Sequence, residues 1–464
     1  MINAFILQHK PFTPQIVKNP EAIRYVVIDL FCGAGGTTTG FSQAKDNAGN
    51  PIAIIAACVN HDHKAIRSHW ENHPEVYHFE EDIRTLELSP LTVIVEKYRE
   101  LYPWAKIVLW ASLECTNFSK AKGGQARDAD SRTLADHLDR YITALDPDYV
   151  QIENVVEFMS WGPLNEFGKP VSMKSGQDWL RWRNHINSFG YRDEWKELNS
   201  ADFGAYTSRN RLFGCFAKEN LPIVWPEPTH SKTGTGKQDL FGNGLLKWKP
   251  VKDLLDFKDE GESIFGRKKP LVENSLKRVY AGLIKEVAGG KEAFLTKYYG
   301  NEKGAHSVNT ACGTLTTEDR FALHQVCCLD KDTLMTTGFI YNPSHGGHTT
   351  SIETGCPTII ARQDKAPLYF IQYQIDQNVR IEIYEDDSET MIKIKEFMAI
   401  YGISDIKMRM LKVSELKLIQ GFPADYKLYG NQSDQKKFIG NSVVPHVVCA
   451  WAEAQGKELL KLAA

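Results

Sequence analysis

Glycine and polar residues follow the predicted strands of the first half of the chain, where they could bind a ligand. Open α/β sheets bind ligands beyond the carboxyl ends of their strands. A glycine turn there lets the backbone approach a phosphate or nucleotide, and a polar residue after the second strand suits ribose hydroxyls. Five such features at one edge predict a binding site. They are Gly33–Gly36, Asn60, Asp82, Cys115 and Glu153.

Alternating strands and helices must position these residues. Apolar, β-branched runs predict strands at 25–31, 52–59, 106–113 and 148–152, and polar residues 62–73 predict a helix. Alternation continues to about residue 216, which indicates an α/β fold with a largely parallel sheet. Taken alone, Cys115 could be a small buried apolar residue and Glu153 the partner of a helix N-terminus.

The sequence changes character at about residue 217, where clustered prolines and a Gly- and Lys-rich stretch predict a domain boundary. Residues 307–317 and 351–361 have similar sequences and predict two related strand–loop elements. Near residue 411 regular patterning returns, with a helix that ends at Gly421 and a loop from residue 438 that leads into a closing helix. The predicted segments are 1–24, 25–216, 217–410 and 411–464.

Composition limits the alternatives. The 464 residues carry a formal net charge of −3, so any nucleic-acid partner must meet a local basic surface. No apolar run approaches the roughly 20 residues that span a bilayer, and the first residues do not resemble a secretory signal. The nine cysteines are scattered without a Cys-x-x-Cys pair, which favours a reducing cytoplasm and no metal site. The histidines between His61 and His78 fit a polar helix better than a ligand set.

Six short motifs, in this order and spacing, resemble those of the DNA cytosine-5 methyltransferase family of bacterial or phage type. They cover the predicted segments 25–216 and 411–464. The resemblance implies a Rossmann-like S-adenosylmethionine-dependent methyltransferase domain, with 217–410 as an inserted, irregular mixed α+β target-recognition domain. The motifs are DLFCGAGG (29–36), CTNFS (115–119), ENV (153–155), SRNRLFG (208–214), QGFP (420–423) and GNSV (440–443).

The resemblance implies methyl transfer to C5 of a flipped-out cytosine in duplex DNA. Cytosine C5 is too weak a nucleophile until a thiolate adds to C6, and Cys115 is the expected nucleophile. Glu153 is expected to protonate or hydrogen-bond N3. Arg211 is expected near the base O2, and Arg209 on sugar and phosphate. The stretch Lys120–Arg132 would close over the base once it leaves the duplex.

By the same resemblance, S-adenosylmethionine is the cofactor. Phe31 would contact its adenine, the 33–36 backbone its methionine part, Asn60 its ribose and Asp82 its adenine amine, while 441–443 would close the site. The full expected cofactor set is Asp29, Phe31, Gly33, Gly35, Gly36, Asn60, His61, Asp82, Ile83, Asn441, Ser442 and Val443. The expected DNA contacts are Ser119, Lys120, Lys122, Arg320, Arg362 and Lys365.

Several positions depart from the family pattern. Glu114 replaces the usual proline before the nucleophile, Thr116 replaces the glutamine after it, and Thr207 replaces the glutamine of Gln-x-Arg-x-Arg. Asn60 stands where an acidic residue is usual. A carboxylate beside the thiol would oppose its ionisation. Adjacent residues of an extended segment point to opposite faces, however, so a structural or cofactor-side role for Glu114 is expected rather than direct chemistry.

Three other functions remain open. A tRNA-methylating relative would use the same chemistry, although the long 217–410 region suits DNA. A catalytically silent DNA-binding protein would not need Cys115, Glu153 and Arg211. A nucleotide-binding oxidoreductase would explain only the glycine turn. The expected partner is double-stranded DNA, met by a monomer, with any cognate restriction endonuclease acting separately and no membrane.

Overall fold

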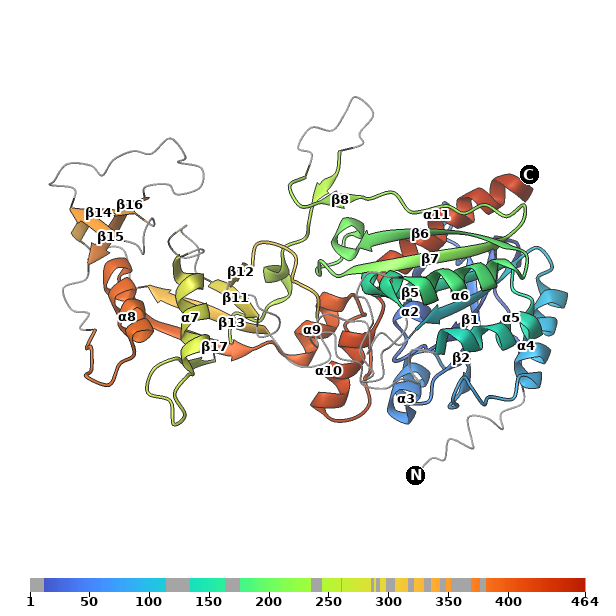
Figure 1. Cartoon of the computed structure of the whole chain (residues 1–464), viewed down its shortest axis with the longest axis horizontal. Coiled ribbons are helices and arrows are strands. Elements are labelled where there is room, and N and C mark those ends of the chain that lie inside the picture. Colours follow the sequence, from blue (N-terminus) through green and yellow to red (C-terminus); the bar gives the residue numbers. More distant parts are fainter. Residues whose placement is uncertain are drawn as a thin grey trace. The chain divides into compact units, whose positions relative to one another are not determined.

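The computed structural model divides the chain into two compact units (Figure 1). The first comprises Met1–Leu255, Asn309–Asp319 and Lys412–Ala464, and the second comprises Asp256–Val308 and Arg320–Leu411. The structure describes residues 12–113, 134–162, 176–234, 244–259, 261–284, 288, 293–297, 305–315, 321–328, 335–342, 348–351, 369–375 and 381–463.

A seven-stranded sheet forms the centre of the first unit. Its strands are β1 (Tyr25–Leu30), β2 (Ala53–Val59), β3 (Tyr77–Phe79), β4 (Lys106–Ser112), β5 (Tyr149–Asn154), β6 (Tyr191–Asn199) and β7 (Asn210–Lys218). Their order is β3-β2-β1-β4-β5-β7-β6, and only β7 runs antiparallel to its neighbours. The chain leaves β1 toward β2 and β3 and then returns to β4 on the other side. The carboxyl ends of β1 and β4 therefore flank the switch point where such sheets bind ligands.

Helices cover both faces of this sheet. The helices of the first unit are α2 (Gly36–Gln43), α3 (His63–Asn72), α4 (Ser89–Leu101), α5 (Leu138–Leu145), α6 (Gln177–Asn187), α9 (Val413–Gln420), α10 (Gln432–Asn441) and α11 (Pro445–Ala463). Buried residues of α4, α5 and α6 pack on the face to which Val26 and Ile28 point. Those of α2, α3 and α11 pack on the face of Tyr25 and Val27. Every β1 residue is buried, Asp29 included, as the largely apolar run predicts.

The N-terminal arm is described from Phe12. The ring of Phe12 packs edge-on against Tyr77 and Tyr98, and the Gln15 side-chain amide donates to the Ile55 carbonyl at 2.6 Å. A single 3-10 turn (Pro20–Ala22) then leads into β1.

The boundary predicted at residue 217 is wrong for residues 217–255, which belong to the first unit. Trp225 stacks on Trp451 with ring centroids 4.8 Å apart, and the Trp451 indole donates to the Val224 carbonyl. Tyr149 donates to the Pro222 carbonyl. Closely spaced prolines suggested a linker, but here they hold an extended segment against the core. Two short strands follow, β8 (His230–Ser231) and β9 (Leu246–Lys247).

Residues 309–315 also belong to the first unit, although they lie within the predicted insertion. Cys312 bridges to Thr207, its N–H donates to the Tyr206 carbonyl at 2.7 Å, and its carbonyl accepts from the Ser208 N–H at 2.6 Å. These bonds fix this segment beside the SRNR motif. The first of the two similar segments, 307–317, is therefore divided after residue 308 between the two units. The second copy lies outside the described residues after Ser351.

The second unit is α+β with antiparallel sheets, which confirms the predicted fold class of the insertion. Helices α7 and α8 pack on one face of a five-stranded sheet of order β10-β17-β13-β11-β12, and a separate sheet has the order β15-β14-β16. Its elements are β10 (Glu262–Ser263), α7 (Glu273–Gly282), β11 (Ala293–Lys297), β12 (Ala305–Ser307), β13 (Phe321–Cys328), β14 (Met335–Asn342), β15 (His348–Ser351), β16 (Tyr369–Ile375), α8 (Glu389–Tyr401) and β17 (Ile403–Met410).

The C-terminal segment returns to the first unit, as its 411–464 pattern predicts. The loop predicted from residue 438 is partly wrong, because α10 continues to Asn441 and only three residues separate it from α11. Among the described helices, none is both long and apolar enough to cross a membrane.

Candidate active site

The carboxyl ends of β1, β4 and β5 lie side by side and define the candidate site. Ser112, near the end of β4, pairs with Glu153 on β5, and Leu30 pairs with Ala111. The described part of this segment ends at Leu113, two residues before Cys115. Several predicted site residues fall outside the described ranges. They are Cys115, Ser119, Lys120, Lys122, Arg320, Arg362 and Lys365.

Glu153 forms an ion pair with Arg211 across the β5–β7 edge. The Arg211 Nε lies 3.3 Å from Glu153 Oε1, and the Glu153 side chain is only 7% exposed. Burial raises the pKa of Glu153, while the charges of Arg211 and Arg209 oppose that rise. The raised pKa favours the protonated form that general acid catalysis requires. Two of the predicted catalytic residues are thus in contact.

Arg209 lies in the protein interior, which does not fit the predicted contact with sugar and phosphate. It is 3% exposed, and its guanidinium donates to the carbonyls of Gly440 at 3.1 Å and Leu315 at 3.4 Å. Neighbouring residues on an extended strand point to opposite sides, but Arg209 and Arg211 are two apart. Two residues on one strand at this spacing would point to the same side. The Arg209 and Arg211 side chains do not, because Arg209 precedes β7, which begins at Asn210. Through its hydrogen bond to the Gly440 carbonyl, Arg209 connects the SRNR motif to the GNSV motif.

The glycine turn after β1 divides into packed and open positions. At Gly35, whose φ is +101°, a Cβ would lie 2.3 Å from the Tyr426 hydroxyl. At Gly36 it would lie 2.4 Å from the Val443 carbonyl oxygen. At Gly33, with φ +52°, it would meet only the Phe31 carbonyl oxygen, at 4.0 Å. Packing therefore requires Gly35 and Gly36, whereas Gly33 leaves its backbone open to a ligand.

Phe31 begins this turn with φ +57°, a left-handed conformation that is uncommon outside glycine. Its ring is half-buried against the core of the sheet. A strained backbone beside an open glycine is a frequent feature of ligand sites.

Asp29 lies beneath the turn and is fully buried. Its Oδ2 accepts from the Thr38 hydroxyl at 3.0 Å, and that hydroxyl oxygen lies 2.9 Å from His69 Nε2. Burial and the nearby Cys58 thiol hold the pKa of Asp29 well above its usual range. Burial also lowers the pKa of His69 to about 4. The position of Asp29 fits support of the turn and α2 better than direct contact with a cofactor.

The predicted ribose and adenine residues follow β2 and β3. Asn60 is half-buried, and its side-chain oxygen accepts from the Asp62 N–H, while His61 is exposed. Asp82 binds Arg84 through the backbone N–H and the guanidinium, and these contacts lower the pKa of Asp82 to about 2. Ile83 is buried, and its carbonyl accepts from the Tyr141 hydroxyl. The Asp82 carboxylate is thus ionised and already paired with Arg84.

The GNSV motif contacts the glycine turn from the C-terminal side. Val443 is buried with its carbonyl beside Gly36, and the Ser442 carbonyl accepts from the Gln420 amide at 2.7 Å. Asn441 is exposed at the end of α10. These contacts join the QGFP and GNSV motifs to the turn.

Sequence reasoning missed Tyr426 and Thr38. The Tyr426 hydroxyl donates to the Ala34 carbonyl at 2.5 Å and fixes the turn. Its place three residues after the QGFP motif could have suggested a role, but Thr38 carries no such signal, because the fold alone brings it to His69.

The sequence model of the C-5 cytosine-specific DNA methylase family matches residues 25–457. The chain belongs to this family. Its relatives include bacterial type II methyltransferases, and the methylase match covers both the α/β unit and the insertion.

Similarity to individual methylases is modest. M.AquIA of Picosynechococcus is 25% identical over 237 residues, which is 49% of this chain and 87% of that protein. M.XorII of Xanthomonas oryzae is 28% identical over 214 residues, which is 45% of this chain and 45% of that protein. A solved putative DNA modification methyltransferase encoded within an E. coli prophage is 17% identical, with a TM-score of 0.47, and the match covers 94% of this chain and 99% of that one.

Proposed function

We propose that this chain methylates C5 of a flipped-out cytosine in duplex DNA, using S-adenosylmethionine and a covalent adduct at Cys115. The observation that carries the proposal is the buried Glu153–Arg211 pair at the end of β5. It stands beside β4, which leads within three residues from Ser112 to Cys115. A thiol three residues after the end of β4 in the sequence and a carboxyl group on the neighbouring strand β5 supply the two groups that the reaction needs.

In this mechanism the Cys115 thiolate adds to C6 of the base. Glu153 donates its proton, or a hydrogen bond, to N3 as the bond forms, which neutralises the charge that the addition places on the ring nitrogen and leaves C5 as the nucleophilic carbon of an enamine. Arg211, already paired with Glu153, stabilises negative charge that develops on the base O2. Once C5 has gained the methyl group and lost its proton to a base, elimination releases Cys115 and restores the aromatic ring.

The residues around the glycine turn fit the cofactor. Gly33 offers open backbone, and Asn60 and Phe31 are partly exposed at the same strand edge. S-adenosylmethionine, when bound there, supplies a methyl group on an electrophilic sulfonium. Asn60 would hold the ribose, Phe31 the adenine, and residues 441–443 would close the site. Asp82 would accept the adenine amine only if its oxygens serve Arg84 and the amine together.

The partners follow from the relatives and are also proposed. The chain acts as a monomer on duplex DNA in a bacterial or phage-infected cytoplasm, and a cognate restriction endonuclease, where one exists, acts as a separate protein. The second unit and the basic residues Arg320, Arg362 and Lys365 would meet the target sequence.

A covalent trap tests the proposal. In DNA that carries 5-fluorocytosine, the fluorine at C5 cannot leave as a proton does, so the final elimination is blocked. The enzyme with S-adenosylmethionine should therefore form a stable adduct that survives denaturation. Cys115→Ala should form none, while Cys215→Ala, which alters a buried thiol on β7, should react as the parent does. An adduct in the Cys115 variant would refute the assignment of the nucleophile.

The same assay separates the other functions. Trapping on tRNA with 5-fluorocytosine, and none on DNA, would favour the RNA enzyme. Cofactor binding without any adduct or methylation would favour the catalytically silent protein. Bisulfite sequencing of DNA from cells that express the chain would then identify the methylated sequence.

A further inference from the structure

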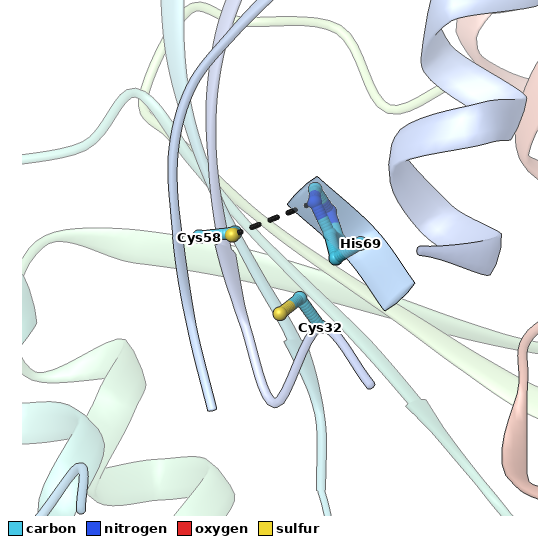
Figure 2. A group of neighbouring side chains, drawn as sticks. All are labelled: Cys32, Cys58 and His69. Carbon is cyan, nitrogen blue, oxygen red and sulfur yellow. Dashed lines mark hydrogen bonds between the residues drawn. The ribbon is translucent and has the colours of Figure 1, made fainter. Parts of the chain in front are cut away.

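Two cysteines and a histidine meet in the interior beneath the glycine turn. Cys32 lies in the turn after β1, Cys58 in β2 and His69 in α3, and all three are buried. Their ligand atoms lie within 4.8 Å of one another, and Figure 2 shows the Cys58 sulfur directed toward the His69 ring, with Cys32 close to both. Within the described part of the chain, no other group of His, Cys or acidic residues converges in this way.

The ring of His69 is oriented by a chain of hydrogen bonds. Thr38 donates its hydroxyl proton to Asp29, so its oxygen accepts from His69 Nε2–H at 2.9 Å. This network places the lone pair of the neutral ring on Nδ1, the atom that also lies 2.8 Å from His78 Nε2. Nδ1 is the atom that faces Cys58 Sγ, at 3.8 Å. A histidine that donates its other N–H toward a carboxylate is the usual arrangement behind a metal ligand.

We propose that Cys32, Cys58 and His69 bind a zinc ion that fastens the cofactor turn to β2 and α3. Two sulfurs and a nitrogen favour Zn²⁺ over harder cations, which prefer oxygen ligands. This site is separate from the methyl-transfer chemistry and does not depend on the proposed function.

The distances suit a tetrahedral ion. With Zn–S near 2.3 Å and Zn–N near 2.05 Å, a sulfur and a nitrogen on one ion stand about 3.6 Å apart. The Cys58 Sγ–His69 Nδ1 separation is 3.8 Å, which is long for a hydrogen bond but close to that value. The spacing of these donors is thus already near what the ion requires.

His78 offers the fourth ligand. It lies on β3 and is buried, with its Nε2 2.8 Å from His69 Nδ1. Two nitrogens on a tetrahedral zinc ion are about 3.3 Å apart, so the His78 ring needs to shift by about half an ångström. A Cys₂His₂ set would then be complete without any exposed residue.

The sequence pattern argued against a metal because it contains no Cys-x-x-Cys pair. Here the ligands come from three elements that the parallel sheet brings together, since β1 and β2 are neighbours and Asp29 pairs with Cys58. An ion at this point would tie Cys32, between Phe31 and Gly33, to the sheet. The zinc site would therefore stabilise the backbone of the glycine turn, which faces the proposed cofactor.

The test measures zinc in the full-length chain with Cys115→Ser, which removes the predicted nucleophile as a competing ligand. The protein is purified without chelators, and zinc is quantified by elemental analysis. We expect one zinc per chain, and an equal loss of zinc from Cys58→Ser and His69→Gln. Cys215→Ala, which alters a buried thiol outside the cluster, should keep its zinc.

Two further measurements guard against misfolded variants. Co²⁺ substituted into the Cys115→Ser protein should give thiolate charge-transfer bands and the strong visible bands of a tetrahedral site. Thr38→Val removes the hydroxyl behind His69 and should weaken zinc binding by about 10–100-fold. The neighbouring Thr39→Val, whose hydroxyl faces Gly35 and His73, should leave zinc affinity unchanged.

Three results would overturn the proposal. The first is a Cys115→Ser protein that neither contains zinc nor takes up added Zn²⁺. The second is a cobalt spectrum without thiolate bands. The third is a thiol titration of the denatured protein that finds fewer than the eight thiols left when Cys115 is replaced, because a Cys32–Cys58 disulfide would exclude the ion.

Discussion

Arg211 Nε lies 3.3 Å from Glu153 Oε1, on neighbouring antiparallel strands and in a site where the carboxylate is nearly buried. Two opposing effects act on the pKa of Glu153 in this pair. Burial raises the pKa of Glu153, which favours the protonated acid, and the guanidinium limits that rise. A carboxyl group balanced in this way can give up its proton to a base and recover it within one catalytic cycle.

Glu153→Gln should lower kcat by about 10²–10⁴-fold, the usual contribution of a general acid. The amide keeps the shape of the side chain and can still hydrogen-bond, but it cannot deliver a proton. Single-turnover methylation assays measure the chemical step, and calorimetry should show unchanged cofactor affinity. Glu197→Gln, an exposed carboxylate on β6, is the matched control and should react normally. Equal rates in both variants would remove Glu153 from the mechanism.

Arg211→Gln should move the pH dependence of kcat/KM as well as lower its value. Arg211 lowers the pKa of Glu153, so its removal lets that pKa rise further. If the protonated acid is the active form, activity is lost as pH rises through this pKa. The falling limb of the profile should therefore shift to higher pH. Arg181→Gln, an exposed arginine paired with Asp136, should leave the limb in place, and a shift to lower pH in Arg211→Gln would contradict the argument.

The edge of the sheet could be predicted because its signals are local. Largely apolar runs that end in glycine or polar residues predict β1, β2, β4 and β5 to within two residues, since a strand buried on both faces favours apolar side chains. The boundary at 217 could not be found, because the packing of Trp225 on Trp451 joins residues far apart in sequence. The burial of Arg209 depends likewise on the Gly440 carbonyl, which no local pattern reveals.

Tyr426→Phe should destabilise the first unit by about 1–3 kcal/mol, because the buried Ala34 carbonyl loses its donor. The change should also weaken cofactor binding, since Ala34 lies in the turn between Gly33 and Gly35. Urea unfolding and calorimetry measure the two effects. Tyr429→Phe, an exposed tyrosine three residues further on, should change neither. Unaltered cofactor affinity with lower stability would confine Tyr426 to a structural role.

Exchange of the second unit should change the methylated sequence without abolishing methyl transfer. The first unit holds the glycine turn, Glu153 and Arg211 and has its own cores, whereas the second has a separate core around α7 and α8. A chimera that takes residues 256–308 and 320–411 from a related methylase should therefore methylate that relative's target. Bisulfite sequencing reads the outcome. Retention of the original target would place specificity in the first unit.

Substitution of Arg209 tests whether this residue stabilises the fold or contacts DNA phosphate. Its guanidinium donates to the Gly440 and Leu315 carbonyls inside the first unit, so Arg209→Met should remove two charge-assisted hydrogen bonds and keep most of the side-chain volume. Such bonds contribute about 1.5–3 kcal/mol each, and unfolding should be easier by at least that amount.

The salt dependence of DNA binding distinguishes the two roles of Arg209. A residue that ties the GNSV motif in place leaves the number of phosphate contacts unchanged, so the slope of log affinity against log salt should match that of the parent. A phosphate contact would lower the slope by about 1, with stability little changed. Lys196→Met, which removes a cation of the same unit stacked over Trp225, serves as the stability control. Because Arg209 is buried, we expect lower stability, weaker cofactor binding and an unchanged slope.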